Sequence, residues 1–270
     1  MRLGLDGVTV GYDAGPVLTA AEVTLDGQHR WAVLGANGSG KTTLLKALSG
    51  ALRPRSGRVL VDDAPLRHGR AALRAHRRLV QLVLQDPDDQ LFAAEVGQDV
   101  SFGPMNLGLS PAEVGERVGE ALALLGISHL RERPVHQLSF GERRRVSIAG
   151  AVAMRPRVLL LDEPSAGLDP QGVAELLATL ELLRGQGSTL VMSTHDVQLA
   201  LAWADRVAIV HDGVVTAGPA IDLLADDALL RAARLTRPWP LELAARLRAA
   251  GRLSPGPAPR TLDEVLKLLG

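Results

Sequence analysis

Phosphate binding is the first chemistry that the residue types offer, through a glycine-rich segment that follows an apolar run. The segment comprises Gly35, Ala36, Asn37, Gly38, Ser39, Gly40, Lys41, Thr42 and Thr43. Glycines let successive backbone N–H groups turn towards one anion, and a helix N-terminus behind them favours its negative charge. Lys41 is long enough to reach β- and γ-phosphates, and the Thr42 hydroxyl can ligate Mg²⁺. The spacing predicts a P-loop, against the alternative of a glycine-rich turn that binds nothing.

Two adjacent carboxylates, Asp162 and Glu163, follow a second apolar run at residues 158–161. A carboxylate at a strand end opposite a P-loop is placed to hold the hydration shell of Mg²⁺, and we assign this role to Asp162. Glu163, one residue further, is placed to orient and deprotonate an attacking water. Taken alone, the pair is equally compatible with a solvated acidic turn. Together with the P-loop it predicts a Mg²⁺-dependent nucleotide hydrolase.

The elements that must position these residues follow from hydrophobic patterning. Short β-type runs precede the P-loop, and leucines at helical spacing follow it up to Gly50. Continuous apolar runs at 158–161, 189–192 and 207–210 are typical of parallel strands that are covered on both faces. Strand and helix signals therefore alternate, which predicts an α/β fold.

Helix signals concentrate in a segment between the two halves of the chemistry. Ser110 and Glu113 have the spacing of a capping box, and Gly126 ends the apolar stripe that follows them. We expect a helical insertion at about 87–157 within an ATPase domain of residues 1–220. The proline-rich segment 221–270 is expected to be a helical appendage with no catalytic role.

Composition narrows the function classes. The chain has 270 residues, of which 46% are hydrophobic, so a buried core is expected and disorder is excluded for most of it. Thirty basic and thirty acidic side chains cancel, which argues against a protein that coats nucleic acid. The absence of cysteine excludes disulfides and thiolate chemistry. Because neither a secretion signal nor a run long enough to cross a bilayer is present, we expect a soluble, cytosolic chain.

Residues 138–142, Leu-Ser-Phe-Gly-Glu, resemble the signature motif of the ATP-binding-cassette (ABC) ATPases, which is usually Leu-Ser-Gly-Gly-Gln. Ser139 and Gly141 match the motif, whereas Phe140 and Glu142 depart from it. In the family, this motif contacts the γ-phosphate that is held by the P-loop of a partner chain. The resemblance therefore implies that Ser139, Gly141 and Glu142 bind ATP in trans.

Other elements of the family fall in the expected order along residues 1–220. Gln85 resembles the Q-loop glutamine, residues 165–169 resemble the D-loop, and His195 resembles the switch histidine. Tyr12, the only tyrosine, stands where the family places an aromatic residue against adenine. The resemblance implies a RecA-like core, an N-terminal antiparallel β subdomain and a helical signature subdomain.

ATP hydrolysis with Mg²⁺ is the reaction that the resemblance implies, carried out by two chains facing head to tail. The implied catalytic residues are Lys41, Gln85, Glu163 and His195. The implied Mg²⁺ ligands are Thr42, Gln85 and Asp162. Tyr12 and the P-loop residues 35–43 are expected to bind the nucleotide.

The extended Q-loop, residues 85–92, is similar to that of energy-coupling-factor importers, especially the cobalt/nickel type. In these importers the segment docks coupling helices of a membrane subunit. The resemblance implies a peripheral ATPase subunit at the cytoplasmic face of the membrane. Its expected partners are a second ATPase subunit (the same or a related chain), a transmembrane coupling subunit and a substrate-capture protein, with no nucleic acid. The expected cargo is cobalt or nickel, with a vitamin as the alternative.

The side chains of this segment suggest how docking would work. We expect Asp88, Asp89, Gln90 and Phe92 to form the outer wall of a groove that accepts a basic amphipathic helix. A non-transport ABC ATPase that acts on DNA or ribosomes is a second hypothesis, but no long coiled-coil insert or tandem cassette is visible. A P-loop kinase, the third, leaves residues 138–142 and His195 unexplained.

Overall fold

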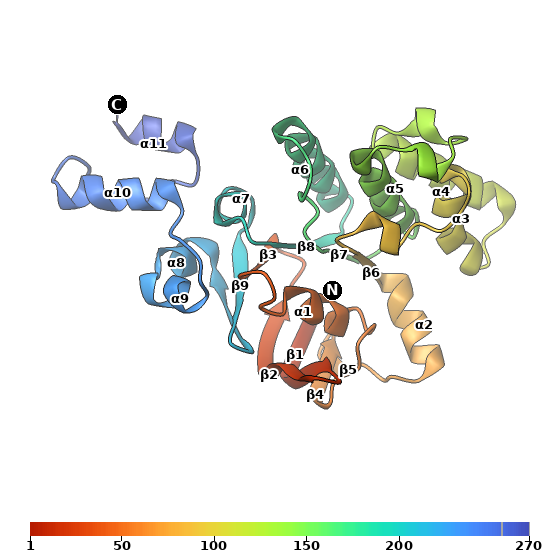
Figure 1. The fold of residues 1–270 in the computed structure, drawn as a ribbon, viewed down its shortest axis with the longest axis horizontal. Helices are drawn as coiled ribbons and strands as arrows, with labels where there is room; N and C mark the ends of the chain where they lie inside the picture. Colours follow the sequence, from red (N-terminus) through yellow and green to blue (C-terminus); the bar gives the residue numbers. More distant parts are fainter. Residues whose placement is uncertain (255, 270) are drawn as a thin grey trace.

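Two β-sheets pack against helix α1 (Lys41–Leu48) in the computed structural model, which describes residues 1–254 and 256–269 (Figure 1). Residues 255 and 270 of the predicted appendage lie outside the described residues. The first sheet has the strand order β2-β1-β4-β5, with bounds β1 Leu3–Tyr12, β2 Gly15–Leu25, β4 Ser56–Val61 and β5 Ala64–Pro65. Its neighbouring strands are antiparallel, as the family resemblance implied.

The second sheet carries the nucleotide chemistry and has the order β10-β9-β3-β8-β7-β6. Its strands are β3 Trp31–Leu34, β6 Val80–Val83, β7 Val158–Leu161, β8 Thr189–Thr194, β9 Arg206–His211 and β10 Val214–Pro219. All neighbours are parallel except the edge strand β10, which pairs antiparallel with β9. The three long apolar runs of the sequence are β7, β8 and β9, so the prediction of covered parallel strands is confirmed.

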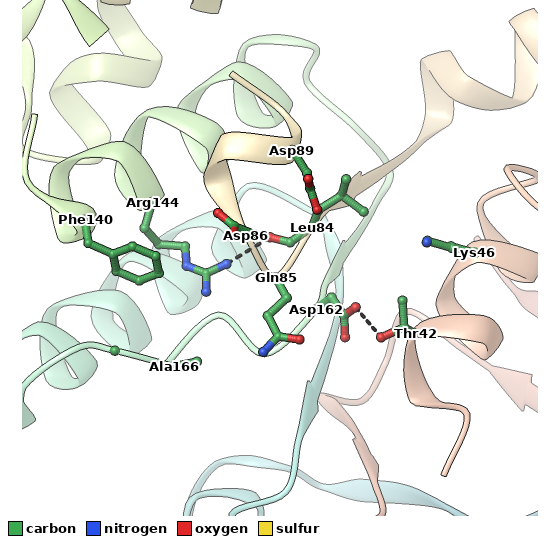
Figure 2. Close-up of a pocket in the computed structure, with 11 residues that line it drawn as sticks. Thr42, Lys46, Leu84, Gln85, Asp86, Asp89, Phe140, Arg144, Asp162 and Ala166 are labelled. Carbon is green, nitrogen blue, oxygen red and sulfur yellow. Dashed lines mark hydrogen bonds between the residues drawn. The ribbon is translucent and has the colours of Figure 1, made fainter. Parts of the chain in front are cut away.

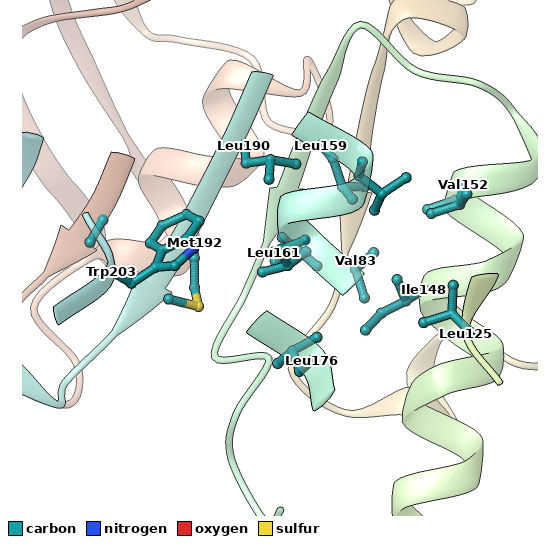
Figure 3. Packing of buried hydrophobic residues seen from close by; sticks show 14 of the residues in the cluster. Val83, Leu125, Ile148, Val152, Leu159, Leu161, Leu176, Leu190, Met192 and Trp203 are labelled. Carbon is teal, nitrogen blue, oxygen red and sulfur yellow. The ribbon is translucent and has the colours of Figure 1, made fainter. Parts of the chain in front are cut away.

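Burial on both faces of this sheet explains the unbroken apolar runs. Successive residues of β7 alternate between two hydrophobic clusters: Leu159 and Leu161 face one, and Val158 and Leu160 face the other. Figure 3 shows the first cluster, where strand residues meet side chains of the helices that cover that face. Because parallel strands end together at one edge, polar residues after β3, β6, β7 and β8 are brought to the same place.

Helices fill the segment between β6 and β7, where the insertion was predicted. They are α3 (Val96–Asn106), α4 (Pro111–Leu124) and α5 (Phe140–Ala153), and α2 (Arg70–Leu79) precedes β6. The predicted capping box is present, because the Ser110 hydroxyl accepts from the Glu113 N–H and the Glu113 carboxylate accepts from the Ser110 N–H. A short 3₁₀ turn, η1 (Pro87–Asp89), follows Gln85.

The C-terminal part contains more helices than the sequence predicted. After α6 (Pro170–Gly185) and α7 (Val197–Trp203) come α8 (Ala220–Ala225), α9 (Asp227–Ala232), α10 (Trp239–Ala249) and α11 (Leu262–Leu269). The sequence indicates one helix near 241–250 and a short one capped by Thr261 and Glu264, which correspond to α10 and α11, but it indicates neither α8 nor α9. Leu224 and Leu230 of these two helices are buried in the main cluster, as is Leu241 of α10. Figure 1 shows α10 and α11 beyond the sheets. Within the described residues, none of the helices combines the length and the hydrophobicity of a membrane span.

Candidate functional site

The P-loop connects β3 to α1 and has the backbone conformation that only glycine adopts easily. Gly40 caps α1 with φ 111°, and no side chain caps the helix there. A Cβ atom at Gly35, where φ is 156°, would lie 2.5 Å from the Val210 carbonyl oxygen. The first N–H groups of a helix have no intrahelical acceptor, so those of α1 face the loop and suit a phosphate. The strand–loop–helix arrangement that the P-loop prediction requires is present.

Lys41 lies inside this loop with 6% of its surface exposed. Its Nζ donates to the carbonyl oxygens of Gly35, at 2.9 Å, and Ala36, at 3.3 Å. The same nitrogen is 3.2 Å from Glu163 Oε1, and both side chains are more than nine-tenths buried. The lysine and the second predicted carboxylate are therefore ion-paired, although 122 positions separate them in the sequence (163 − 41).

Asp162 and Thr42 form a pair of oxygen donors at the ends of β7 and the P-loop. Thr42 Oγ1 donates to Asp162 Oδ2 at 2.6 Å, and Ser193 Oγ donates to Asp162 Oδ1 at 2.5 Å. A carboxylate and a hydroxyl are the hard oxygen ligands that Mg²⁺ takes in phosphoryl-transfer sites. Asp162 is 2% exposed and keeps its orientation through both hydrogen bonds, so the residues present fit this ion.

Glu163 has an unusual backbone, with φ 45° in the left-handed region. Two hydrogen bonds of its main chain hold this conformation. The Glu163 N–H donates to Ser193 Oγ at 2.9 Å, and the Glu163 carbonyl accepts from Arg144 Nη2 at 3.1 Å. The side chain meets His195, whose Nδ1 is 3.0 Å from Glu163 Oε2. His195 itself remains 58% exposed, so one face of the ring is open to a ligand.

A cavity of about 430 Å³ lies beside the P-loop and joins residues from five parts of the chain. It is lined by Tyr12, Val17, Asn37, Gly38, Gly40, Lys41, Thr42, Thr43, Gln85, Glu163 and His195. Tyr12, at the end of β1, is 45% exposed, as an aromatic residue that stacks on a ligand must be. The structure thus brings together residues that the sequence predicted as one site.

A second cavity, of about 470 Å³, adjoins the first on the side of α5 (Figure 2). Thr42, Gln85 and Asp162 lie along it together with Phe140 and Arg144 of α5. Figure 2 shows the hydrogen bond between Thr42 and Asp162, and the hydrogen bond by which Arg144 reaches Leu84. Gln85 lines both cavities and therefore stands between the nucleotide chemistry and the helical segment.

The signature residues occupy the start of α5 rather than the cavity beside the P-loop. The Ser139 hydroxyl accepts from the Glu142 N–H at 3.3 Å, and Glu142 Oε2 accepts from the Ser139 N–H at 2.7 Å. The backbone and side-chain hydrogen bonds of Ser139 lower the pKa of Glu142 below its usual range. Within the described residues, neither Ser139, Gly141 nor Glu142 lines the P-loop cavity. They stay apart from it, as a composite site would require.

The structure agrees with part of the expectation for the extended Q-loop, because Gln90 and Phe92 line one groove, whereas Asp88 and Asp89 are not among its lining residues. Gln90 also makes hydrogen bonds within the chain: its Oε1 accepts from the Leu84 N–H at 3.1 Å, and its Nε2 donates to the Ser147 carbonyl at 3.3 Å. Asp88 is ion-paired with Arg143 Nε at 2.9 Å. Both contacts join the segment around η1 to α5.

Sequence reasoning also missed two residues of the site, Ser193 and Arg144. Ser193 is fully buried directly after the apolar residues 190–192 of β8, and a hydroxyl at the end of a covered strand was the available signal. Arg144 stands in an arginine-rich stretch of α5, where spacing does not distinguish a buried guanidinium from an exposed one. Both make hydrogen bonds to the main chain of Glu163.

A parallel sheet with a P-loop, a buried lysine and paired carboxylates at its strand ends defines a P-loop nucleotide hydrolase. The family model described as ABC transporter matches residues 18–166. This chain belongs to the ABC transporter family, as an ATPase that binds ATP and couples its hydrolysis to transport. The predicted ABC fold is confirmed by this match.

Relatives narrow the type of ABC ATPase. A cobalt import ATP-binding protein, CbiO, of Rhodobacter capsulatus is 57% identical over 234 residues, 86% of this chain and 84% of that protein. An energy-coupling factor transporter ATP-binding protein, EcfA, of Methanoculleus marisnigri is 47% identical over 236 residues, 87% of this chain and 84% of that protein. The solved structure of cbiO1 from Clostridium perfringens, described as part of the transporter complex cbiONQ, matches with a TM-score of 0.76. The identity is 38%, and the match covers 92% of this chain and 96% of that chain. The chain is thus an ABC ATPase of the energy-coupling-factor and CbiO type.

Proposed function

We propose that ATP is hydrolysed in the cavity beside the P-loop by the residues that the sequence singled out. The observation that carries the proposal is the contact of Glu163 with Lys41 on one carboxylate oxygen and with His195 on the other, at 3.2 and 3.0 Å. ATP binding is assigned to Tyr12 and residues 35–43, Mg²⁺ binding to Thr42, Gln85 and Asp162, and catalysis to Lys41, Gln85, Glu163 and His195.

Each group has a chemical task at this place. The Lys41 ammonium and the first-turn amides of α1 stabilise negative charge on the β- and γ-phosphates. Mg²⁺, when bound at Thr42 and Asp162, would neutralise further charge on those oxygens. Glu163 accepts the proton of the attacking water, and the half-exposed His195 ring contacts the γ-phosphate.

Removal of the proton acceptor tests this assignment. Glu163→Gln keeps the size of the side chain, so ATP binding should persist while turnover falls by orders of magnitude, about 100-fold or more. Lys41→Ala should weaken nucleotide binding itself. ATP affinity and phosphate release are measured in parallel. The matched control is Glu175→Gln, because Glu175 is an exposed residue of α6 that is ion-paired with Arg145. Wild-type turnover in Glu163→Gln would remove Glu163 from the mechanism.

Two chains are proposed to share each site. Ser139, Gly141 and Glu142 lie outside the cavity that holds Lys41 of the same chain, and this separation supports a head-to-tail pair in which they complete the partner's site. ATP then lies between the two subunits, and hydrolysis loosens the pair. The second subunit is either a copy of this chain or a related ATPase.

Cobalt or nickel ions are the proposed cargo. The support is the likeness to the Rhodobacter protein that is named for cobalt import. The cargo would pass through membrane subunits, and this chain supplies energy from the cytoplasmic face. Uptake of labelled Co²⁺ by cells that express the chain with its membrane partners should cease in the Glu163→Gln variant. If cells with the wild-type chain took up a vitamin but no metal ion, the chain would instead be assigned to a vitamin importer.

A groove between α2 and α3 is the proposed docking site of a helix from the transmembrane subunit. Its volume is about 960 Å³. One wall carries Arg70, Arg74, Arg77 and Arg78, which the helical repeat places on a single face of α2. The other presents Phe92 and Phe102, 65% and 52% exposed, with ring centroids 4.7 Å apart. This lining suits an apolar helix whose α2-facing side is acidic, instead of the basic helix that we expected from the sequence.

A further inference from the structure

Arg144 connects three segments of the site although it contacts none of the expected reacting atoms. It belongs to α5, the helix that begins with the signature residues. Nη1 donates to the Leu84 carbonyl at 2.9 Å, directly before Gln85, and Nη2 donates to the Glu163 carbonyl at 3.1 Å. Figure 2 shows the first of these two bonds. One planar guanidinium thus fixes the distance between the backbone of the Q-loop and that of the proposed base.

The burial of this side chain is unusual for an arginine. Arg144 is 1% exposed, and its Nε has no hydrogen-bond partner within the described residues. Burial lowers the pKa of Arg144 from its ordinary value, while the charges of Asp162, Asp86 and Glu163 oppose the change. Burial of the guanidinium carries a desolvation cost, which its hydrogen bonds to the Leu84 and Glu163 carbonyls offset.

Phe140 adds a contact to the D-loop segment. The Arg144 guanidinium carbon is 5.6 Å from the centre of the Phe140 ring. The other neighbour of the ring is Gly167, where φ is 75° and a Cβ atom would lie 2.9 Å from the ring edge. The unusual Phe140 of the signature motif therefore packs between the arginine and residues 165–169.

We propose that Arg144 is a positioning residue that holds Gln85 and Glu163 in register with the start of α5. A movement of the signature residues is thereby transmitted to the backbone on both sides of the nucleotide. The proposal rests on the proposed role of Glu163 as the base. Arg144 acts on turnover through that carboxylate and leaves ATP binding, which depends on the P-loop and Tyr12, largely untouched.

Three variants test the role. Arg144→Met removes every hydrogen-bond donor of a side chain of similar length, and Arg144→Lys keeps the positive charge and a single donor group. The control, Arg155→Met, removes an arginine just after α5 that is ion-paired with Glu120 at the surface. We expect Arg144→Met to lower kcat by about 10- to 100-fold, as misplaced catalytic groups do, with ATP affinity changed less than about threefold. Arg144→Lys should recover part of kcat, and Arg155→Met should match the wild type.

A double-mutant cycle separates positioning from general damage. In the Glu163→Gln background, Arg144→Met should lower the single-turnover rate much less than it does in the wild type, because one of the two groups that it positions is already replaced. Additive losses, a wild-type kcat in Arg144→Met, or a parallel loss of ATP affinity would each overturn the proposal. So would failure of both Arg144 variants to fold, since that result makes the residue structural. Wild-type turnover in Glu163→Gln alone instead overturns the assignment of the base.

Discussion

Ser193 shows how one hydroxyl supports both carboxylate residues of the site. It is fully buried, donates to Asp162 Oδ1 and accepts from the Glu163 N–H. Ser193→Ala leaves a buried N–H without an acceptor and frees one oxygen of Asp162. The expected cost is about 1–3 kcal/mol of unfolding free energy, the usual penalty for an unsatisfied buried group. Turnover should fall as well, because Glu163 loses one of the bonds that hold its left-handed backbone.

Chemical denaturation and steady-state ATPase assays check this expectation. Ser188→Ala is the matched control, because the Ser188 hydroxyl also donates one hydrogen bond, to the Pro156 carbonyl, at the far end of the same sheet. A Ser193→Ala protein with the stability and turnover of the control would show that the hydroxyl is dispensable.

At this scale the sequence predicts residues whose role depends on the backbone or on spacing. The P-loop, Asp162 and Glu163 follow from a strand–turn–helix pattern and from the end of an apolar run. The hydrogen bonds of Gln90 could not be predicted, because the direction of its side chain depends on what α5 presents to it. That information comes from residue 147, which lies 57 positions away (147 − 90).

A partly buried ion pair between Arg30 and Asp205 connects the starts of two neighbouring strands of the central sheet. Arg30 precedes β3 and Asp205 precedes β9, its parallel neighbour. The Arg30 backbone N–H and Nε donate to Asp205 Oδ2 at 2.8 and 3.1 Å, and Nη2 donates to Oδ1 at 2.8 Å. The two side chains are 24% and 28% exposed. Such a fork-shaped contact is the strong form of a charged hydrogen bond.

The pH dependence of this pair has a definite sign. Burial alone would raise the pKa of Asp205, but the hydrogen bonds and charge of Arg30 lower it below the ordinary 3.8. The pair therefore contributes full stability above that value, and the contribution is lost as pH falls through the lowered pKa of the folded state. Asp205→Asn should cost about 1–2 kcal/mol at pH 7, and the difference from the wild type should shrink below pH 4, about where the carboxylate is protonated.

Urea unfolding between pH 3 and 7 measures this difference. Asp6→Asn provides the comparison, because the Asp6–Arg58 pair is exposed and contributes little. A constant difference between Asp205→Asn and the wild type across the range would contradict the linkage.

Element type was predictable where a single physical cause dominates. Double-sided burial gives the unbroken runs of β7 to β9, and a reciprocal cap gives the start of α4. Helices α8 and α9 have six residues each, too short for a periodic stripe, and they are stabilised by packing Leu224 and Leu230 into the core. Tertiary contacts, which the local sequence does not encode, decide such elements.

At the scale of the whole molecule, the separation of Ser139 from the P-loop cavity predicts complementation. Lys41→Ala and Ser139→Arg each inactivate one half of a composite site. If two copies of this chain pair, a mixture of the two inactive proteins should contain one intact site in each mixed dimer. Recovered ATPase activity in a titration of one variant into the other measures this effect. Mixing Lys41→Ala with Glu163→Gln is the control, because both changes fall on the P-loop half of a site. Each site of the mixed dimer then carries one of the two changes, and no activity should return.

The groove along α2 is where the nucleotide site and a membrane partner would communicate, because α2 is joined to the P-loop helix. His76 of α2 is 3% exposed, and its Nε2 is 2.9 Å from the Leu48 carbonyl at the end of α1. On the opposite face of α2, Arg74 also donates to the Asn106 carbonyl of α3, so the two walls of the groove are in contact. In the proposed docking mode, a displacement of α1 would reach the arginine-lined wall through His76.

Charge reversal on this wall tests the proposed docking mode. Arg74→Glu with Arg78→Glu should weaken assembly with the transmembrane subunit about tenfold or more, because an acidic helix face would then meet like charges. ATP affinity of the isolated chain should not change. Arg246→Glu on α10, 78% exposed, removes a cation away from the groove and should assemble normally. If the partner helix were basic and seated on Asp88 and Asp89, the charge reversal would strengthen assembly. Replacing both aspartates by alanine would then weaken it, and that pattern in a pull-down titration would reject the arginine wall.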